Sequence, residues 1–292
     1  MIKHPDYNSP IELKNFLDEN GMAMQKKFGQ NFLVNADARK KLIDVLDIDE
    51  NSKVWEVGPG LGSMTDEILS RGATLTSFEI DHGFARLVRQ FFEDYSEKNK
   101  FSVVEGDVLK TWKKHCDECG VPDRFFGNLP YNVAATIIGD MINGGVRFDK
   151  IVVTIQKEVA MRMTAAPGTE DYSSFSVLCQ WAYDVKNVLD LAGGNFWPVP
   201  NVASRAVLMT KKADFPRCKN PSLFMRMIRQ LFSSRRKTVR NNLLKMAGGG
   251  ENCDKVLAAA GVNPSVRAEA MSVDELLKLS DCLSDVVGNS KK

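Results

Sequence analysis

The sequence predicts an α/β fold with a mostly parallel β-sheet, followed by a small α-helical domain. Between residues 50 and 156, short β-rich runs alternate with amphipathic helical stretches, as in repeated β-α-β units. After Lys211, apolar residues recur instead at helical spacing. A length of 292 residues suits one large and one small domain. The composition, 43% hydrophobic and 26% charged, is typical of a folded protein and excludes a disordered or collagenous chain.

Five runs are apolar enough to form strands that are buried on both faces. These strands are expected at Lys53–Val57, Thr74–Glu79, Phe101–Glu105, Arg124–Gly127 and Lys150–Gln156. Helices are expected between them, at about Ser63–Arg71, Gly83–Tyr95 and Val133–Asn143. Two later runs, Lys186–Leu191 and Ala203–Thr210, are predicted to complete the sheet.

The C-terminal part is predicted to be helical throughout. One helical stretch is expected from Pro221 to Ala247, ended by the glycines 248–250. Shorter helices are expected at Asp254–Ala260 and Val273–Leu283. The boundary between the two domains should lie near Lys211–Asn220.

Charge is divided unequally between the two parts, although the whole chain has a net charge of only +2. Residues 1–200 hold 22 basic and 29 acidic side chains, a net charge of −7, while residues 201–292 hold 17 and 8, a net charge of +9. This asymmetry indicates that the basic part contacts a polyanion such as nucleic acid, or a membrane surface.

A glycine-rich loop follows the first predicted strand of the sheet. Its sequence, from Glu56 to Gly62, is EVGPGLG, and it comes just before a predicted helix. Glycines at such a place let the backbone approach a ligand and leave helix N–H groups free. The spacing is one residue tighter than the G-x-G-x-x-G of dinucleotide folds.

Two acidic residues follow the next two strands. Glu79 comes 21 residues after Gly58, the position from which a carboxylate accepts the hydroxyls of a ribose. Asp107 follows the third strand and is placed to accept an adenine N–H. These features predict a nucleoside-containing ligand, either S-adenosylmethionine or NAD. The alternative is that the glycines only make a tight turn and the acids only cap helices.

The segment Asn128-Leu129-Pro130-Tyr131 follows the fourth strand, on the same edge of the sheet. The exocyclic amine of adenine is a poor nucleophile, because its lone pair is delocalised into the ring. The Asn128 side-chain oxygen and the Leu129 carbonyl are predicted to accept both amine hydrogens, with Pro130 fixing the backbone. Tyr131 offers a face for an extruded base. The alternative is a plain turn with a buried tyrosine.

Together these motifs resemble the KsgA-type rRNA adenine N6,N6-dimethyltransferases. The resemblance covers about residues 24–285 and rests on an ordered set of segments: KFGQNFL from Lys27, EVGPGLG from Glu56, FEID from Phe78, EGD from Glu105, FGNLPYN from Phe126, QKEV from Gln156, FWPVP from Phe196 and FSSRRKTVR from Phe232. It implies a Rossmann-like class I S-adenosylmethionine-dependent methyltransferase domain at residues 24–211, an N-terminal tail at 1–23 and a helical RNA-binding domain at 212–292.

The resemblance also implies the roles of single residues. The residues expected to bind S-adenosylmethionine are Asn31, Leu33, Gly58, Gly60, Glu79, Asp107 and Asn128. Those expected to form the catalytic pocket for the target base are Asn128, Leu129, Pro130 and Tyr131, with Phe196 as a second aromatic wall. The implied substrate is a pair of adjacent adenosines in the hairpin near the 3′ end of small-subunit (16S) rRNA, each dimethylated during ribosome biogenesis, within a 30S assembly particle.

Basic residues between 201 and 245 give that stretch 12 positive charges and one negative charge. We interpret this run as an unpaired, helical, RNA-binding surface, because an ordinary exposed helix mixes signs. The residues expected to bind RNA are Arg235, Arg236, Lys237 and Arg240. A solvated helix face is the alternative.

Two other functions remain open at this level. One is an Erm-type enzyme that dimethylates a large-subunit adenosine; the other is a non-catalytic relative that only binds nucleic acid. The chain departs from the family pattern at Asn201, Ala203 and Ser173-Ser174, positions where the resemblance implies contacts with RNA or with the domain junction rather than with the methyl donor.

Cysteine use and the absence of membrane signals suggest a cytoplasmic protein, which we expect to be a monomer. No apolar run reaches the length of about 18 residues that a membrane helix needs, and the start of the chain lacks the features of a signal peptide. Six mostly scattered cysteines suit free thiols. The pair Cys116 and Cys119, after His115, is interpreted as part of a polar loop and not as a metal site.

Overall fold

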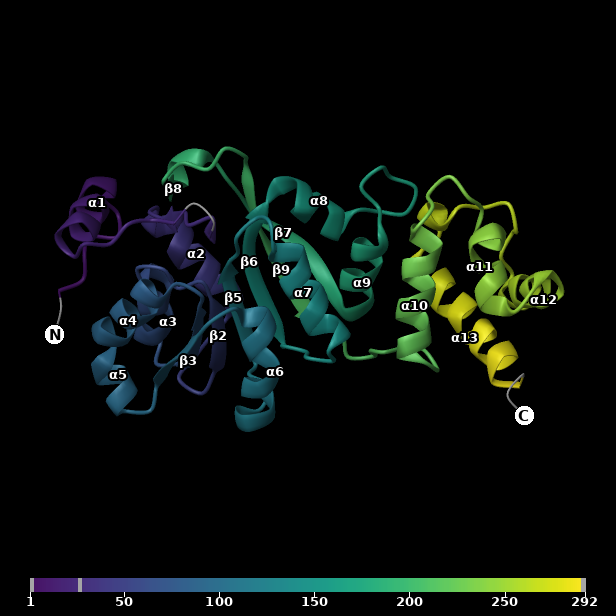
Figure 1. The fold of residues 1–292 in the computed structure, drawn as a ribbon, viewed down its shortest axis with the longest axis horizontal. Helices are drawn as coiled ribbons and strands as arrows, with labels where there is room; N and C mark the ends of the chain where they lie inside the picture. Colours follow the sequence, from purple (N-terminus) through teal and green to yellow (C-terminus); the bar gives the residue numbers. More distant parts are fainter. Residues whose placement is uncertain (1–2, 26–27, 290–292) are drawn as a thin grey trace. The chain divides into compact units, whose positions relative to one another are not determined.

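The structure is a computed structural model that describes residues 3–25 and 28–289 (Figure 1). The chain divides into two compact units. Unit 1 comprises Met1–Ala160 and Lys186–Lys211, and unit 2 comprises Met161–Val185 and Lys212–Lys292. The second unit therefore includes a segment of about 25 residues that the sequence analysis placed before the boundary, because this segment packs with the helical core described below.

Unit 1 contains most of the sheet and the helices on its two sides. Its elements are α1 (Pro10–Glu19), β1 (Phe32–Leu33), α2 (Ala36–Leu46), β2 (Lys53–Val57), α3 (Ser63–Ser70), β3 (Thr74–Glu79), α4 (His82–Phe91), α5 (Glu93–Glu97), β4 (Phe101–Glu105), α6 (Val108–Cys119), β5 (Arg124–Asn128), α7 (Ala134–Asn143), β6 (Lys150–Gln156), the start of α8 (Lys157–Thr164), the end of β7 (Tyr183–Leu191), a short 3-10 turn (Gly193–Asn195), β8 (Phe196–Trp197) and β9 (Ser204–Lys211).

The seven-stranded sheet has the order β4-β3-β2-β5-β6-β9-β7. The first five strands are parallel and β9 runs antiparallel to β6. From β2 the chain adds β3 and then β4 on one side of the sheet. It then crosses back to place β5 on the other side of β2, followed by β6, so the strand order reverses between β2 and β5. Open α/β sheets form a ligand crevice at such a reversal. The predicted α/β class is confirmed, and four of the five predicted parallel strands have the predicted bounds, while β5 is one residue longer.

Two predictions about local structure in unit 1 are wrong. The expected helix at Gly83–Tyr95 is two helices, α4 and α5, separated at Phe92, whose φ of −113° and ψ of 29° are not helical. The expected polar loop around Cys116 and Cys119 is helix α6, which buries only Val108 and Trp112. Two buried positions in twelve give too weak an apolar period to be recognised. No group of three or more His, Cys, Asp or Glu side chains that could hold a metal occurs within 3–25 and 28–289.

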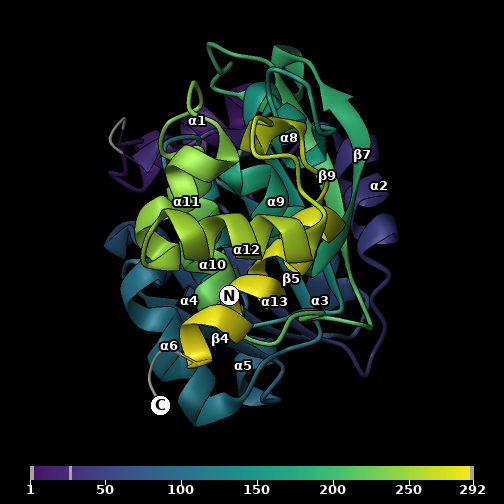
Figure 2. The same cartoon turned by 90° about the vertical axis from the view of Figure 1, so that its right-hand side faces the viewer.

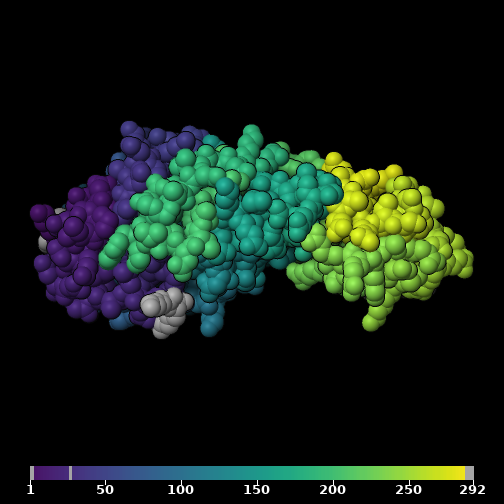
Figure 3. Space-filling view, turned by 90° about the horizontal axis from the view of Figure 1, so that it is seen from above, coloured from purple at the N-terminus to yellow at the C-terminus, as the bar shows by residue number. Residues whose placement is uncertain are grey.

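The N-terminal segment, which the sequence analysis left as a tail, folds against unit 1. Ser9 caps α1 by accepting a hydrogen bond from the Glu12 N–H, and Pro10 occupies the first turn. Leu13 and Leu17 are buried in the same core as the sheet. Figure 3 shows the N-terminal region, in purple, beside the green region that contains β8; the antiparallel pairing of β1 with β8 agrees with this view.

Unit 2 is a helical body, and Figure 2 labels its helices α9 to α13. Its elements are the end of α8, α9 (Ser174–Ala182), the start of β7, α10 (Pro221–Phe232), α11 (Val239–Ala247), α12 (Gly250–Ala260), a 3-10 turn (Ala268–Ala270) and α13 (Val273–Asn289). One apolar cluster joins these helices, with Phe224, Leu243, Leu257 and Leu276 almost completely buried. No helix of the described chain is long and apolar enough to cross a membrane.

The single helix predicted from Pro221 to Ala247 is wrong. It is two helices, α10 and α11, joined by residues 233–238. Thr238 begins α11 by accepting a hydrogen bond from the Asn241 N–H. Phe232 and Val239 are seven residues apart, which is two helical turns, so the apolar period continues across the break and does not reveal it. The break places Arg235, Arg236 and Lys237 in a loop, where the sequence analysis expected a helix.

Candidate active site

The glycine loop between β2 and α3 has a backbone that side chains rarely adopt. Gly58, Gly60 and Gly62 have φ angles of 76°, 56° and 86°. A Cβ atom on Gly60 would lie 2.7 Å from the ring of Phe32, and one on Gly62 would lie 2.7 Å from the ring of Phe92. Both the backbone angles and the space therefore require glycine here.

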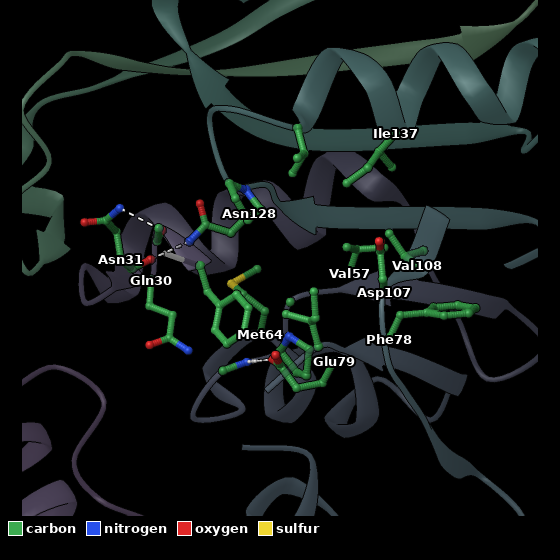
Figure 4. A pocket seen from close by; sticks show the side chains of 18 of the residues that line it. Gln30, Asn31, Val57, Met64, Phe78, Glu79, Asp107, Val108, Asn128 and Ile137 are labelled. Carbon is green, nitrogen blue, oxygen red and sulfur yellow. Dashed lines mark hydrogen bonds between the residues drawn. The ribbon is translucent and has the colours of Figure 1, made fainter. Parts of the chain in front are cut away.

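A cavity of about 320 Å³ lies above this loop, at the carboxyl ends of β2, β3, β4 and β5. Figure 4 shows side chains from several of these elements facing it. All seven residues that the sequence analysis expected to bind the cofactor line the cavity: Asn31, Leu33, Gly58, Gly60, Glu79, Asp107 and Asn128. The segment quoted from Lys27 contributes Phe28–Leu33 to the wall, while Lys27 itself lies outside the described residues.

Glu79 is a buried carboxylate that holds the glycine loop. Its Oε2 accepts a hydrogen bond from the Gly60 N–H at 3.2 Å (Figure 4), and its Oε1 accepts one from the Asp81 N–H at 2.9 Å. Burial raises the pKa of Glu79 to about 7 and the charge of Asp81 raises it further, while these backbone hydrogen bonds lower it. Glu79 is therefore poised between its two charge states near neutral pH.

Asp107 also acts as a helix cap. Its Oδ1 accepts a hydrogen bond from the Leu109 N–H at 3.0 Å at the start of α6. Capping a helix is the role that Asp107 has in the alternative interpretation, in which the acidic residues do not bind a ligand. The same side chain lines the cavity, and a carboxylate has lone pairs beyond the one used by the cap. The two interpretations are therefore compatible at this residue.

Asn128 ends β5 and connects three parts of the site. Its Nδ2 donates a hydrogen bond to the Asn31 carbonyl oxygen at 2.6 Å (Figure 4). Its Oδ1 accepts one from the Thr154 hydroxyl at 2.5 Å. Gly29, in the same segment as Asn31, lies next to Pro130. A Cβ atom added to Gly29 would be 3.6 Å from the Pro130 Cβ. The segment 28–33 and the Asn128–Tyr131 segment thus form one wall.

The other predicted base-pocket residues are placed differently. The Leu129 side chain is 1% exposed and points into the core, which leaves its backbone carbonyl as the relevant group. Tyr131 is half-buried, and its hydroxyl lies 2.5 Å from the Ser204 Oγ. Phe196 is 2% exposed and pairs with Leu33 across β1 and β8. Among the described residues, Pro130 and Asn128 line the cavity, whereas Leu129, Tyr131 and Phe196 do not.

The sequence analysis missed several apolar residues of the cavity. They include Met64, Phe78, Ile80, Val108 and Ile137. Ile80 is the most informative, because it is 46% exposed although it directly follows a buried strand. An exposed large apolar side chain beside Glu79 provides a surface for a flat ring. An isoleucine immediately after Glu79, the carboxylate predicted to bind the ribose, was the available signal.

The expectation of an unpaired basic run is wrong for Arg235 and Arg240, whose side chains have acidic partners. The Arg235 Nε donates to Glu269 Oε2 at 3.0 Å, and its Nη2 donates to the Glu170 carbonyl oxygen at 2.8 Å. Arg240 makes two hydrogen bonds to the Asp254 carboxylate, at 2.6 and 2.9 Å. Arg236 and Lys237 are exposed and have no acidic partner in the described part of the chain.

Two of the departures from the family pattern have structural roles. The Ser173 N–H donates to the Ser176 Oγ at 2.9 Å at the start of α9. The Ala203 carbonyl oxygen accepts a hydrogen bond from the Lys157 N–H at 2.9 Å, which connects β9 to the start of α8. Both contacts use backbone groups, so they place positions 173 and 203 at the ends of elements but do not explain why serine and alanine stand there.

The parallel sheet, whose strand order reverses between β2 and β5, and the glycine loop at its carboxyl edge define a Rossmann-like methyltransferase. Two solved structures share this fold: a dimethyladenosine transferase from Plasmodium falciparum, with 24% identity and a TM-score of 0.73 over 84% of this chain and 94% of that one, and the 23S rRNA methyltransferase ErmE, with 22% identity and a TM-score of 0.62 over 86% and 99%.

The family follows from the sequence comparisons. The model of the family described as ribosomal RNA adenine dimethylase matches residues 21–285. A relative from Treponema denticola, named ribosomal RNA small subunit methyltransferase A, is 47% identical over 97% of both chains. The chain belongs to the ribosomal RNA adenine dimethylase family, and it is an S-adenosylmethionine-dependent methyltransferase. The residues that line the cavity fit this cofactor, because two carboxylates, those of Glu79 and Asp107, offer hydrogen-bond acceptors among largely apolar side chains.

Proposed function

We propose that this enzyme dimethylates the N6 amines of two adjacent adenosines in the hairpin near the 3′ end of small-subunit rRNA, in a 30S assembly particle. The observation that carries the proposal is the position of Asn128. It ends β5 at the same edge of the sheet as the glycine loop and lines the cofactor cavity. The choice of the small subunit is supported by the 47% identical relative of that name; the large-subunit enzyme ErmE is 22% identical.

The cofactor is proposed to bind between the glycine loop and the segment 28–33. Glu79 accepts the ribose hydroxyls and Asp107 accepts the adenine amine. Gly58 and Gly60 have no side chains, so the backbone there lies close to the cofactor. Asn31, Leu33 and Asn128 close the other side of the cavity. S-adenosylmethionine supplies an electrophilic methyl group, so the protein needs only to position the acceptor amine in line with it.

The target amine is proposed to bind at Asn128 and the Leu129 carbonyl oxygen. The Asn128 Oδ1 has two lone pairs, of which the Thr154 hydroxyl occupies one. The second lone pair and the Leu129 carbonyl hold the two amine hydrogens and turn the nitrogen lone pair toward the methyl group. Pro130 fixes the backbone between these two acceptors, and Tyr131 stacks on the base. The role of Phe196 as a second wall stays a prediction.

The pH should change cofactor affinity through Glu79. The carboxylate accepts both ribose hydroxyls, whereas the protonated acid has one oxygen occupied by its own proton. Since the pKa of free Glu79 is about 7, affinity should be weakest below pH 6, rise through pH 7 and level off above pH 8. Binding near pH 7 should therefore release a proton. Calorimetry of S-adenosylmethionine binding between pH 5.5 and 8.5, in buffers of different ionisation enthalpy, measures both quantities. In Glu79→Gln the rise should vanish; the same rise in that variant would assign the titration to another group.

Phosphate binding is proposed for Arg236 and Lys237, because these two side chains are exposed and without acidic partners among residues 3–25 and 28–289. The double change Arg236→Gln/Lys237→Gln should weaken binding of the small-subunit particle and lower the slope of log affinity against log salt by about 2, one for each lost phosphate contact. Filter binding between 50 and 300 mM salt measures both effects.

A control removes two positive charges elsewhere in unit 2, one of which, that of Lys255, is paired with Glu251 at 2.7 Å. Lys255 and Lys278 are also exposed, on α12 and α13, and Lys255→Gln/Lys278→Gln should leave the salt slope unchanged. Equal salt slopes for the wild type and the Arg236/Lys237 variant would show that these two side chains bind no phosphate and only form part of the solvated surface. Arg235 is kept in both variants, because its loss would release the carbonyl of Glu170 and the carboxylate of Glu269.

The proposed substrate is tested with labelled S-adenosylmethionine. The protein is incubated with unmethylated 30S particles and, separately, with large-subunit particles, and the modified nucleotides are mapped. Label on two adjacent adenosines near the 3′ end of the small-subunit rRNA is the expected result. Label on large-subunit rRNA alone would overturn the proposal. We also propose that the enzyme acts as a monomer in the cytoplasm, where ribosomal subunits are assembled.

A further inference from the structure

Thr154 is a buried hydroxyl in the middle of an apolar strand. It lies in β6, between β5 and β9, and is 1% exposed. Its neighbours along the strand, Val153 and Ile155, are completely buried and apolar. A valine has almost the same shape and suits a buried strand better, because a buried hydroxyl costs free energy unless it is hydrogen-bonded. The partner of this hydroxyl therefore indicates its purpose.

That partner is the side chain of Asn128. The Asn31 carbonyl oxygen accepts a hydrogen bond from Asn128 at 2.6 Å, and a carbonyl can only accept, so the NH2 end of the carboxamide faces Asn31. The oxygen end then faces Thr154, whose hydroxyl donates to it at 2.5 Å. The two bonds together determine which end of the carboxamide lies where.

The backbone of Thr154 holds the second acceptor. Its carbonyl oxygen accepts a hydrogen bond from the Leu129 N–H at 3.1 Å, and Asn128 and Thr154 are directly paired in the register of β5 and β6. One residue thus contacts both the side chain of Asn128 and the backbone of Leu129, the two groups proposed to hold the target amine.

We propose that Thr154 is a positioning residue for methyl transfer, which aims the Asn128 Oδ1 at the target amine. This inference rests on the proposed function, since it concerns the acceptor site assigned there. Without the hydroxyl, the carboxamide keeps only its bond to Asn31 and can rotate about its terminal torsion. The amine would then be held in a wider range of orientations, and fewer of them would place its lone pair in line with the methyl group.

The test separates positioning from folding through kcat and KM. Thr154→Val should lower kcat about tenfold or more, because a small misalignment of reacting groups is costly, while KM for S-adenosylmethionine and the thermal midpoint stay near wild type. Thr154→Ser keeps the hydroxyl and should recover most of kcat. As a control, Thr76→Val removes a hydroxyl from β3 of the same sheet, where its partner is Ser102, and should change neither parameter.

A double variant tests whether Thr154 acts through Asn128. In single-turnover measurements, Thr154→Val should cost nothing further once Asn128→Ala is present. Additive losses, or near-wild-type kcat in Thr154→Val, would overturn the positioning role. These outcomes differ from a failure of the proposed function, in which the wild-type protein itself would transfer no methyl groups to adenosines of the small-subunit particle.

Discussion

Replacing Asn128 by alanine is expected to lower the rate of methyl transfer by about a hundredfold to a thousandfold and to leave cofactor binding largely intact. The change removes the side-chain acceptor for the target amine. Loss of one preorganised hydrogen-bonding group at a reaction centre commonly lowers kcat by about a hundredfold to a thousandfold. The affinity for S-adenosylmethionine should change by only about threefold to tenfold, because the change also breaks the hydrogen bond to the Asn31 carbonyl.

Single-turnover transfer to 30S particles and calorimetry of cofactor binding measure these two effects separately. Asn143→Ala is a suitable control, since Asn143 ends α7 and does not line the cavity. If Asn128→Ala turned over at close to the wild-type rate, the proposed acceptor role would be refuted. If it failed to bind the cofactor at all, Asn128 would belong to the cofactor site alone.

Replacing Glu79 by alanine is expected to have the largest effect on cofactor binding. Hydrogen bonds to a charged acceptor contribute about 1.5 to 3 kcal/mol, so the loss of the carboxylate should raise the Kd for S-adenosylmethionine by about tenfold to a hundredfold. The change also frees the Gly60 and Asp81 N–H groups, which loosens the glycine loop. At saturating cofactor, kcat should recover toward that of the wild type, because Glu79 contacts no reacting atom in the proposed site.

Glu56 provides the matched control for Glu79. It is a second buried carboxylate, and burial raises its pKa to about 7 as well. Its Oε2 accepts hydrogen bonds from the hydroxyls of Thr65 and Ser77, and it does not line the cavity. Glu56→Gln should therefore lower stability without a comparable loss of cofactor affinity. Equal losses of affinity in Glu56→Gln and Glu79→Ala would show that general loosening of the sheet edge, and not a ribose contact, causes the effect.

The parallel strands were predictable because each is a short run buried on both faces. β2, β3, β4 and β6 have the predicted bounds. Helix α6 buries only two residues, so it was missed. The break between α10 and α11 was missed for another reason: the apolar residues on its two sides keep the helical spacing. The N-terminal helix α1 was missed because Leu13 and Leu17 are buried by contacts with the rest of unit 1, which the local sequence does not reveal.

The sequence by itself determined the family, the fold class and seven of the residues that line the cavity. Their positions directly after parallel strands bring them to one edge of the sheet, whatever the details of packing. Only the tertiary structure decided which polar groups pair. Asp254 and Glu269 neutralise Arg240 and Arg235 from other helices and turns, across 14 and 34 residues, and Thr154 reaches Asn128 from the neighbouring strand, across 26 residues. Such pairs depend on which elements become neighbours in space, and the local pattern of residue types does not encode that information.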